Sequence, residues 1–120
     1  MSLTAKRNEY ILLLKSSVDK IVDVLAGQVE KISIFGSYPK GKTNLFSDLD
    51  VLIIMKTDKS FLERMKEIYT LLALPVDADI LCYTPEEWEK IKDRGFFKKI
   101  LAEEVVLYEK GSECGRDAVA

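Results

Sequence analysis

The sequence predicts an α/β sandwich, in which helices pack against a sheet. Two observations lead to this class. Long segments with apolar residues at helical spacing alternate along the chain with shorter apolar runs of strand length. Polar or proline-containing connections, such as residues 56–59 and Pro75, separate these segments. The spacing of apolar residues does not fix the order of the strands within the sheet.

The first half of the chain is predicted to form one helix and two strands. Residues 5–26 carry apolar side chains at helical spacing, and Gly27 follows them as a stop signal. Residues 29–35 are predicted to form the first strand and residues 48–55 the second. The uninterrupted apolar run at 51–55 indicates that the second strand is buried on both faces.

The second half continues the alternation. The residues Thr84, Pro85 and Glu87 are typical of a helix start: an N-cap, a proline at the first helical position and a capping-box glutamate. The elements predicted in this half are a helix at 60–74 ended by Pro75, a strand at 76–83, the helix that starts after Thr84, a helix at 96–103 and a last strand at 104–108.

Length and tail composition predict one domain. A chain of 120 residues buries roughly two thirds of its unfolded surface, which is enough for a hydrophobic core. We expect residues 1–110 to form this domain. Residues 111–120 are mostly small and polar, and we expect them to form a flexible C-terminal tail.

Composition excludes several classes of function. The net charge of −2 gives no general affinity for nucleic acid, and the absence of histidine excludes a Ser-His-Asp triad and histidine metal ligands. No apolar run is long enough to span a bilayer, and no signal peptide opens the chain. We therefore expect a cytoplasmic protein that does not bind membranes, with Cys82 and Cys114 as reduced thiols.

The residues best suited to chemistry lie between the first two predicted strands. Because successive side chains of a strand point to opposite faces, Asp48 and Asp50 share a face and Leu49 points into the core. Two carboxylates that converge in this way suit Mg²⁺, which also takes phosphate ligands. The turn at Gly36-Ser37 allows close backbone approach to a phosphate and adds a hydroxyl and an amide N–H.

Taken singly, these motifs are weak. An Asp-x-Asp sequence is common in a chain of this charge, where a solvated strand edge is its usual explanation. The dinucleotide pattern GxGxxG is absent. Residues 36–43 do have the P-loop spacing GxxxxGK[ST], but a Lys-Thr next to a glycine is a plausible false positive. The ligand spacing of an EF-hand is also missing. The combination and the order of the motifs along the chain are more specific.

This combination resembles the nucleotidyltransferase superfamily that includes DNA polymerase beta, and above all its small prokaryotic branch, the minimal nucleotidyltransferases. The residues that match are Gly36-Ser37, Gly41 and Ser47-Asp48-Leu49-Asp50. Nearly the whole chain is covered by the resemblance. It departs at Pro39, where many relatives carry a small residue. The fold implied is the nucleotidyltransferase fold: a small mixed sheet with helices packed mainly on one face.

The resemblance also implies a catalytic site. Asp48, Asp50 and Asp79 would be the catalytic carboxylates and would hold two Mg²⁺ ions, with Mn²⁺ as the alternative ion. Asp79 is selected by its distance from Thr84-Pro85 in the family pattern. Asp77 shares its face by strand alternation, so the roles of Asp77 and Asp79 stay open.

The nucleotide would lie against the turn. Gly36 and Ser37 would cradle the β- and γ-phosphates. Lys42 or Lys40 would neutralise the leaving pyrophosphate, unless both are simply solvated. Ser47 would orient Asp48 or cap the turn.

The expected activity is transfer of a nucleoside monophosphate to a hydroxyl, with AMP from ATP as the first choice and another nucleoside triphosphate as the alternative. Stand-alone members of this family are often paired with a small helical HEPN protein and act as antitoxins by adding AMP to its tyrosine. Two alternatives stay open: a non-catalytic module that binds a nucleotide or a partner, and a transferase acting on an antibiotic-like small molecule as a homodimer.

Overall fold

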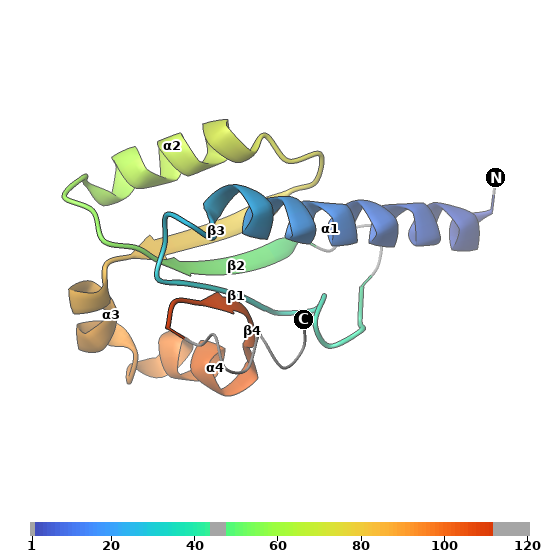
Figure 1. Ribbon diagram of the computed structural model, residues 1–120. Coiled ribbons are helices and arrows are strands. Elements are labelled where there is room, and N and C mark those ends of the chain that lie inside the picture. Colours follow the sequence, from blue (N-terminus) through green and yellow to red (C-terminus); the bar gives the residue numbers. More distant parts are fainter. Residues whose placement is uncertain (1, 44–47, 112–120) are drawn as a thin grey trace.

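The computed structural model describes residues 2–43 and 48–111. Figure 1 shows helices on both sides of a central sheet. The elements are α1 (Leu3–Leu25), β1 (Lys31–Phe35), β2 (Leu49–Ile54), α2 (Phe61–Leu72), β3 (Ala78–Tyr83), α3 (Pro85–Ile91), α4 (Gly95–Glu103) and β4 (Val105–Glu109). Each predicted helix and strand is present, and the predicted ends differ by one or two residues.

The four strands form one mixed sheet in the order β3-β2-β1-β4. Strand β1 pairs antiparallel with β2 and with β4, and β2 pairs parallel with β3. The register places Phe35 opposite Asp50 and Asp50 opposite Asp79. These three residues therefore form a row across three neighbouring strands, and their side chains point to the same face.

The two long helices cover one face of the sheet (Figure 1). From α1 this face receives Leu14, Val18, Ile21 and Leu25, and from α2 it receives Ile68 and Leu72. Strand β2 contributes Leu49, Val51 and Ile53, which are fully buried. At roughly 1.5–3 kcal/mol for each buried aliphatic side chain, this layer is the main source of stability.

The two short helices pack on part of the opposite face. Their residues Trp88 and Ile100 contact Phe35, Leu52 and Ile54 of the sheet. Strand β2 is thus buried on both faces, as its apolar run predicted. The predicted fold class is confirmed: the long helices lie on one face of a small mixed sheet, and α3 and α4 add a partial second layer.

Side-chain caps fix where three of the helices begin. Ser2 and Ser60 cap α1 and α2. At α3 the predicted capping box is present: the Glu87 amide donates to Thr84 Oγ1 over 3.1 Å, and the Thr84 amide donates to Glu87 Oε1 over 2.9 Å. Helix α2 ends before Pro75, with Ala73 in the left-handed conformation at φ 43°.

Side chains of α2 cover the outer edge of β3. The Tyr69 hydroxyl donates to the Ala78 carbonyl over 2.7 Å and accepts from the Ile80 amide over 3.0 Å. Arg64 donates to the Cys82 carbonyl over 3.3 Å and forms an ion pair with Glu87 at 2.7 Å. An edge strand with free backbone groups pairs readily with other chains, and these contacts occupy three of those groups.

Helix α4 is anchored to the sheet and to the loop that follows β1. Glu104, at the end of the helix, accepts hydrogen bonds from Lys31 at 2.5 Å and from Ser33 at 2.8 Å. Glu103 forms an ion pair with Lys40 of the loop at 3.0 Å. Cys82 is a free, buried thiol, and Cys114 lies outside the described residues. None of the helices in the described ranges has the length and apolarity needed to cross a membrane.

Candidate functional site

The predicted catalytic aspartates lie at one end of the β2–β3 pair. Asp50 and Asp79 are directly opposite each other in parallel register, and Asp48 lies one residue before β2. Asp48 and Asp79 are exposed, and Asp50 is partly buried. Leu49, between Asp48 and Asp50 in the sequence, is fully buried against the opposite face, as the alternation of side chains predicted.

The electrostatics of Asp50 show how close the carboxylates lie. Burial, and after it the negative charges of Asp79 and Asp48, together raise the pKa of Asp50 to about 6. Asp77 is not among the groups that act on Asp50. The three aspartates named from the sequence therefore share one electrostatic environment, which is strongly negative when all three are ionised.

Asp77 and Asp79 differ in position. Asp77 precedes β3, and its carbonyl accepts a hydrogen bond from the Leu49 amide over 3.0 Å. Its charge, together with that of Asp48, reaches Tyr10 of α1, where burial is the first cause of a raised pKa. Strand register thus brings Asp79 beside Asp50 and leaves Asp77 before the start of β3.

The Gly36-Ser37 turn lies directly against the Asp50 carboxylate. Gly36 has φ +82°, and a Cβ at this position would overlap Asp50 Oδ2 and lie 3.2 Å from Asp50 Cγ. Glycine is therefore needed here both for the backbone conformation and for the close approach. Two backbone bonds shape the loop that follows: Lys42 N–H to the Ser37 carbonyl and Gly41 N–H to the Tyr38 carbonyl, each 3.1 Å.

A cavity of about 370 Å³ lies between this loop and α4, and we call it the loop cavity. Asp50 lies at one side of it, next to Gly36 and Ser37. Lys40 and Lys42 also line it. Lys40 is paired with Glu103, whereas Lys42 forms no ion pair with any described residue.

A second cavity of about 300 Å³ lies on the other side of Asp50, and we call it the strand cavity. Asp50 and Asp79 are its acidic residues. The other residues that line it are aromatic or aliphatic: Phe35, Tyr69, Ile80, Leu81 and Phe96. Phe35, Asp50 and Phe96 border both cavities, so a group bound beside Asp50 can face a ligand on either side.

The donor set suits a divalent cation. Carboxylate oxygens are the ligands that Mg²⁺ prefers, and a cation bound among like-charged carboxylates would relieve their repulsion. Within the described residues, no group of three His, Cys, Asp or Glu side chains is arranged to hold a metal ion. The residues fit the ion by their chemistry and by their proximity: after burial, the negative charges of Asp79 and Asp48 are the causes of the raised pKa of Asp50.

Helix α4 contributes residues that the sequence did not single out. Phe96, Lys99, Ile100 and Glu103 line the loop cavity. Their spacing of three and four residues places them on one face of the helix, and this spacing is visible in the sequence. What the sequence does not show is that the chain brings this face back to the Gly36-Ser37 turn. Ser47, which was predicted to bind the nucleotide, lies outside the described residues.

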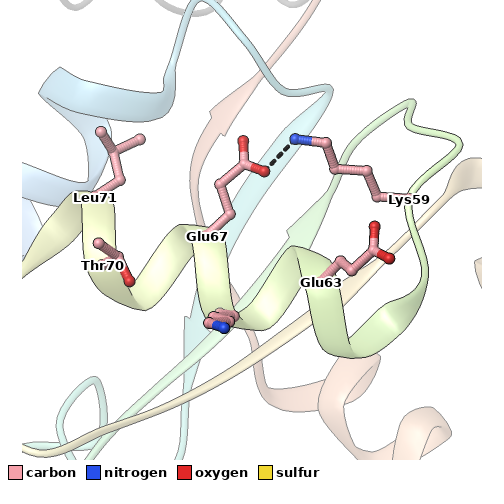
Figure 2. A pocket seen from close by; sticks show the side chains of 6 residues that line it. Lys59, Glu63, Glu67, Thr70 and Leu71 are labelled. Carbon is pink, nitrogen blue, oxygen red and sulfur yellow. Dashed lines mark hydrogen bonds and ion pairs between the residues drawn. The ribbon is translucent and has the colours of Figure 1, made fainter.

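A further hollow, of about 510 Å³, lies away from these residues on the outer side of α2. Figure 2 shows its lining: Glu63, Glu67, Thr70 and Leu71 follow one another along the helix, and Lys59 reaches across to pair with Glu67. None of the aspartates or the Gly36-Ser37 turn borders it. It therefore has no part in the site described above.

The mixed sheet, the Gly-Ser turn and the aspartates that face it define the class of this protein as a nucleotidyltransferase. Residues 15–108 match the model of the nucleotidyltransferase domain family. The chain belongs to this family, and it is a transferase enzyme.

Individual relatives agree with this assignment. A proposed protein adenylyltransferase of Methanocaldococcus jannaschii is 32% identical over 73 residues, which are 61% of this chain and 74% of the relative. A crystal structure of a proposed nucleotidyltransferase from Sulfolobus solfataricus has a TM-score of 0.56 at 18% identity, covering 93% of this chain and 91% of the other.

Two solved toxin–antitoxin structures share the fold as well. A mutant of the toxin–antitoxin MntA–HpeT matches with a TM-score of 0.53 at 18% identity, over 88% of this chain and 80% of the other. A toxin–antitoxin with AMP-PNP matches with a TM-score of 0.52 at 16% identity, over 87% and 80%. At these identities the likeness concerns the fold alone.

Proposed function

We propose that this protein is a metal-dependent nucleotidyltransferase that moves AMP from ATP to an acceptor hydroxyl. The observation that carries the proposal is the pairing of Asp50 with Asp79 in parallel register, with the Gly36-Ser37 turn packed against the Asp50 carboxylate. This arrangement brings negative charge for a cation and backbone N–H groups for phosphates to the same place.

In the proposed site, Asp48, Asp50 and Asp79 are the metal ligands. Two Mg²⁺ ions, or Mn²⁺ in their place, would supply positive charge for the attacking and leaving oxygens of an in-line displacement. Family members generally use divalent metals, which supports this choice. The negative charges of Asp79 and Asp48, which add to burial in raising the pKa of Asp50 to about 6, support it too.

The remaining residues bind and orient the substrates. The amides of Gly36 and Ser37 and the Ser37 hydroxyl hold the phosphates, and Lys42 neutralises the departing pyrophosphate. The acceptor oxygen attacks the α-phosphorus, the bond to pyrophosphate breaks, and Asp79 accepts the proton of the acceptor hydroxyl. The strand cavity, where Asp79 lies, is the side on which we place the acceptor.

For the acceptor we propose a tyrosine of a small helical HEPN-type partner, which would make this protein an antitoxin. The relative from Methanocaldococcus jannaschii, a proposed protein adenylyltransferase, supports a protein as acceptor. The similarity of fold to toxin–antitoxin structures, one of them with AMP-PNP, supports both the kind of partner and the nucleotide. We place the reaction in the cytoplasm, where the free thiol of Cys82 would stay reduced.

The test uses ATP labelled at the α-phosphate, Mg²⁺, this protein and the product of the adjacent gene. We expect label on the partner protein, and we expect its loss in the Asp48→Asn/Asp50→Asn double variant and in Asp79→Asn. Asp77→Asn is the matched control, because Asp77 precedes β3 and does not act on Asp50. This variant is expected to keep most of the transfer.

The outcomes separate the alternatives. Binding of ATP without label on any protein would move the acceptor to RNA or to a small molecule. Unchanged metal-dependent ATP binding in the double variant would show that the aspartates are wrongly assigned. Equal loss in Asp77→Asn and Asp79→Asn would contradict the distinction between these two residues.

A further inference from the structure

We propose that α4 forms the second half of the nucleotide site and that Lys99 binds the triphosphate opposite Lys42. This inference rests on the function proposed above, and it assigns a ligand to a helix face that no sequence motif marks. The loop cavity has two walls: the loop at 36–42, and the face of α4 that carries Phe96, Lys99, Ile100 and Glu103.

The charges in the cavity indicate the chemistry of its ligand. Lys40, Lys42 and Lys99 all line it. Lys40 is paired with Glu103, and Lys99 also lowers the pKa of Glu103, although the Lys40 contact is the first cause. In the described parts of the chain, neither Lys42 nor Lys99 forms an ion pair. Two lysines on opposite walls are therefore available for a polyanion.

The position of α4 is fixed by contacts at its C-terminal end. Glu104 is held by Lys31 and Ser33 of β1, and its side chain is only 9% exposed. Glu103 ties the same end of the helix to the loop through Lys40. Because both walls are joined to each other and to the sheet, Lys99 is presented by a rigid element rather than by a mobile one.

The residues shared by the two cavities indicate how the nucleotide is oriented. Phe96 and Asp50 border both cavities, and the Phe96 ring packs edge-on against Phe35 with the centroids 6.2 Å apart. We place the α-phosphate at this junction, where the strand cavity can supply the acceptor. The β- and γ-phosphates then extend into the loop cavity between Lys42 and Lys99. The volume of about 370 Å³ lies within the range of small-molecule sites.

The experiment measures nucleotide affinity by calorimetry in the full chain, with MgATP, MgADP and AMP as ligands. Lys99→Ala is expected to weaken MgATP binding about tenfold, the size of one lost charge-assisted contact. The loss should be smaller for MgADP and absent for AMP. Lys98→Ala is the matched control, because this lysine is adjacent, exposed and outside the cavity. Lys99→Arg should retain most of the affinity, since it keeps the charge.

The results test the role of Lys99 separately from the proposed function. A Lys99→Ala variant that binds MgATP like Lys98→Ala, or that loses affinity for AMP as much as for MgATP, would overturn the role of Lys99 while leaving the proposed function intact. A wild-type protein that binds none of the three nucleotides would overturn both. Thermal unfolding midpoints of Lys99→Ala and of a second variant, Lys99→Gln, show that a change in affinity is not a change in folding.

Discussion

Gly36 is the residue on which the geometry of the site depends most directly. Its positive φ and the carboxylate of Asp50 above it exclude any other side chain from the same position. The glycine thus connects the backbone amides at the turn with the acidic row on the strands. Gly41, in the same loop, also has a positive φ of +72°, but nothing lies within 4 Å of a Cβ placed there.

Alanine at these two glycines should therefore have unequal effects. Gly41→Ala is expected to cost about 1 kcal/mol for the left-handed backbone alone. Gly36→Ala carries the same cost and adds the collision with Asp50, which we expect to bring the loss to about 3 kcal/mol. Urea unfolding measures both values, and labelled transfer measures activity. Equal losses in the two variants would show that the contact with Asp50 is unimportant.

From the raised pKa of Asp50 we predict how the stability of the metal-free protein changes with pH. The unfolded-state pKa of Asp50 is about 3.9 and its folded-state pKa is about 6, so the folded protein holds this proton more tightly. Its contribution to stability is greatest below about pH 4 and falls as the pH rises through about 6. An asparagine at this position removes the charge at every pH.

We therefore expect Asp50→Asn to raise the thermal midpoint above that of the wild type at about pH 8 in EDTA. At about pH 4.5 the difference should be much smaller, because Asp50 is then largely protonated in the folded protein. Thermal unfolding at the two pH values measures it. A difference of the same size at both would mean that Asp50 is not strained by its neighbours. The same substitution is expected to abolish transfer.

At the scale of single residues, the sequence predicts part of this site and leaves the rest open. Strand alternation is sufficient to place Asp48 and Asp50 on one face and Leu49 in the core. Alternation cannot show whether Asp77 or Asp79 is the third catalytic residue, because it places both side chains on the same face. Only the register of β3 against β2 makes the distinction, and register depends on how α2, which connects the two strands along the chain, packs on the sheet.

At the scale of elements, the contact between α2 and β3 holds Asp79 in place. The Tyr69 hydroxyl binds the backbone on both sides of Asp79, at Ala78 and at Ile80. A single side chain thus covers the strand edge and fixes the peptide groups that carry a predicted catalytic residue. The sequence assigned Tyr69 only to a helix, because nothing in a helical pattern shows which strand a hydroxyl will reach.

Tyr69→Phe tests this contact while keeping the aromatic ring. Two hydrogen bonds are lost and two backbone groups lose their partner, so we expect a destabilisation of about 1–2 kcal/mol in urea unfolding. Turnover should fall while the affinity for MgATP stays unchanged, because Tyr69 and Asp79 border the strand cavity and not the loop cavity. Tyr83→Phe, in β3, is the control and should affect neither stability nor turnover strongly. A parallel fall in affinity would contradict the separation of the two cavities.

The elements themselves were predictable for local reasons. The capping box at Thr84 and Glu87, the apolar run of β2 and the helical spacing in α1 are all patterns within short windows. The role of α4 was not predictable in this way. The face of α4 that carries Phe96 and Lys99 becomes a wall of the loop cavity only because β4 pairs with β1 and Glu104 binds Lys31 and Ser33. These are contacts between residues far apart in the chain.

At the scale of the whole molecule, the core of the described residues is formed well before residue 111. Buried core residues run from Leu14 to Ile100, and β4 ends the sheet at Glu109. We propose, as the sequence predicted, that residues 1–110 form the domain. Residues 112–120 lie outside the described ranges.

A chain that ends at Gly111 should therefore unfold at the same temperature as the full chain. A chain that ends at Glu104 lacks β4, and we expect it to be strongly destabilised because β1 loses a paired strand and the partly buried Leu107 and Tyr108. Calorimetric unfolding compares the three chains. A large loss on removal of residues 112–120 alone would show that the domain extends further than proposed.

The first turns of α1 extend beyond the sheet, and Figure 1 shows them projecting toward the N-terminus. The buried residues of this helix begin at Leu14, while Leu3 is 74% and Leu12 is 65% exposed. Within this projecting part, Arg7 donates to the carbonyl of Thr43 in the loop over 3.0 Å. Residues 3–13 span about 16 Å along the helix axis. Through Arg7, the exposed start of α1 is therefore joined to the Gly36-Ser37 loop at a point outside both cavities.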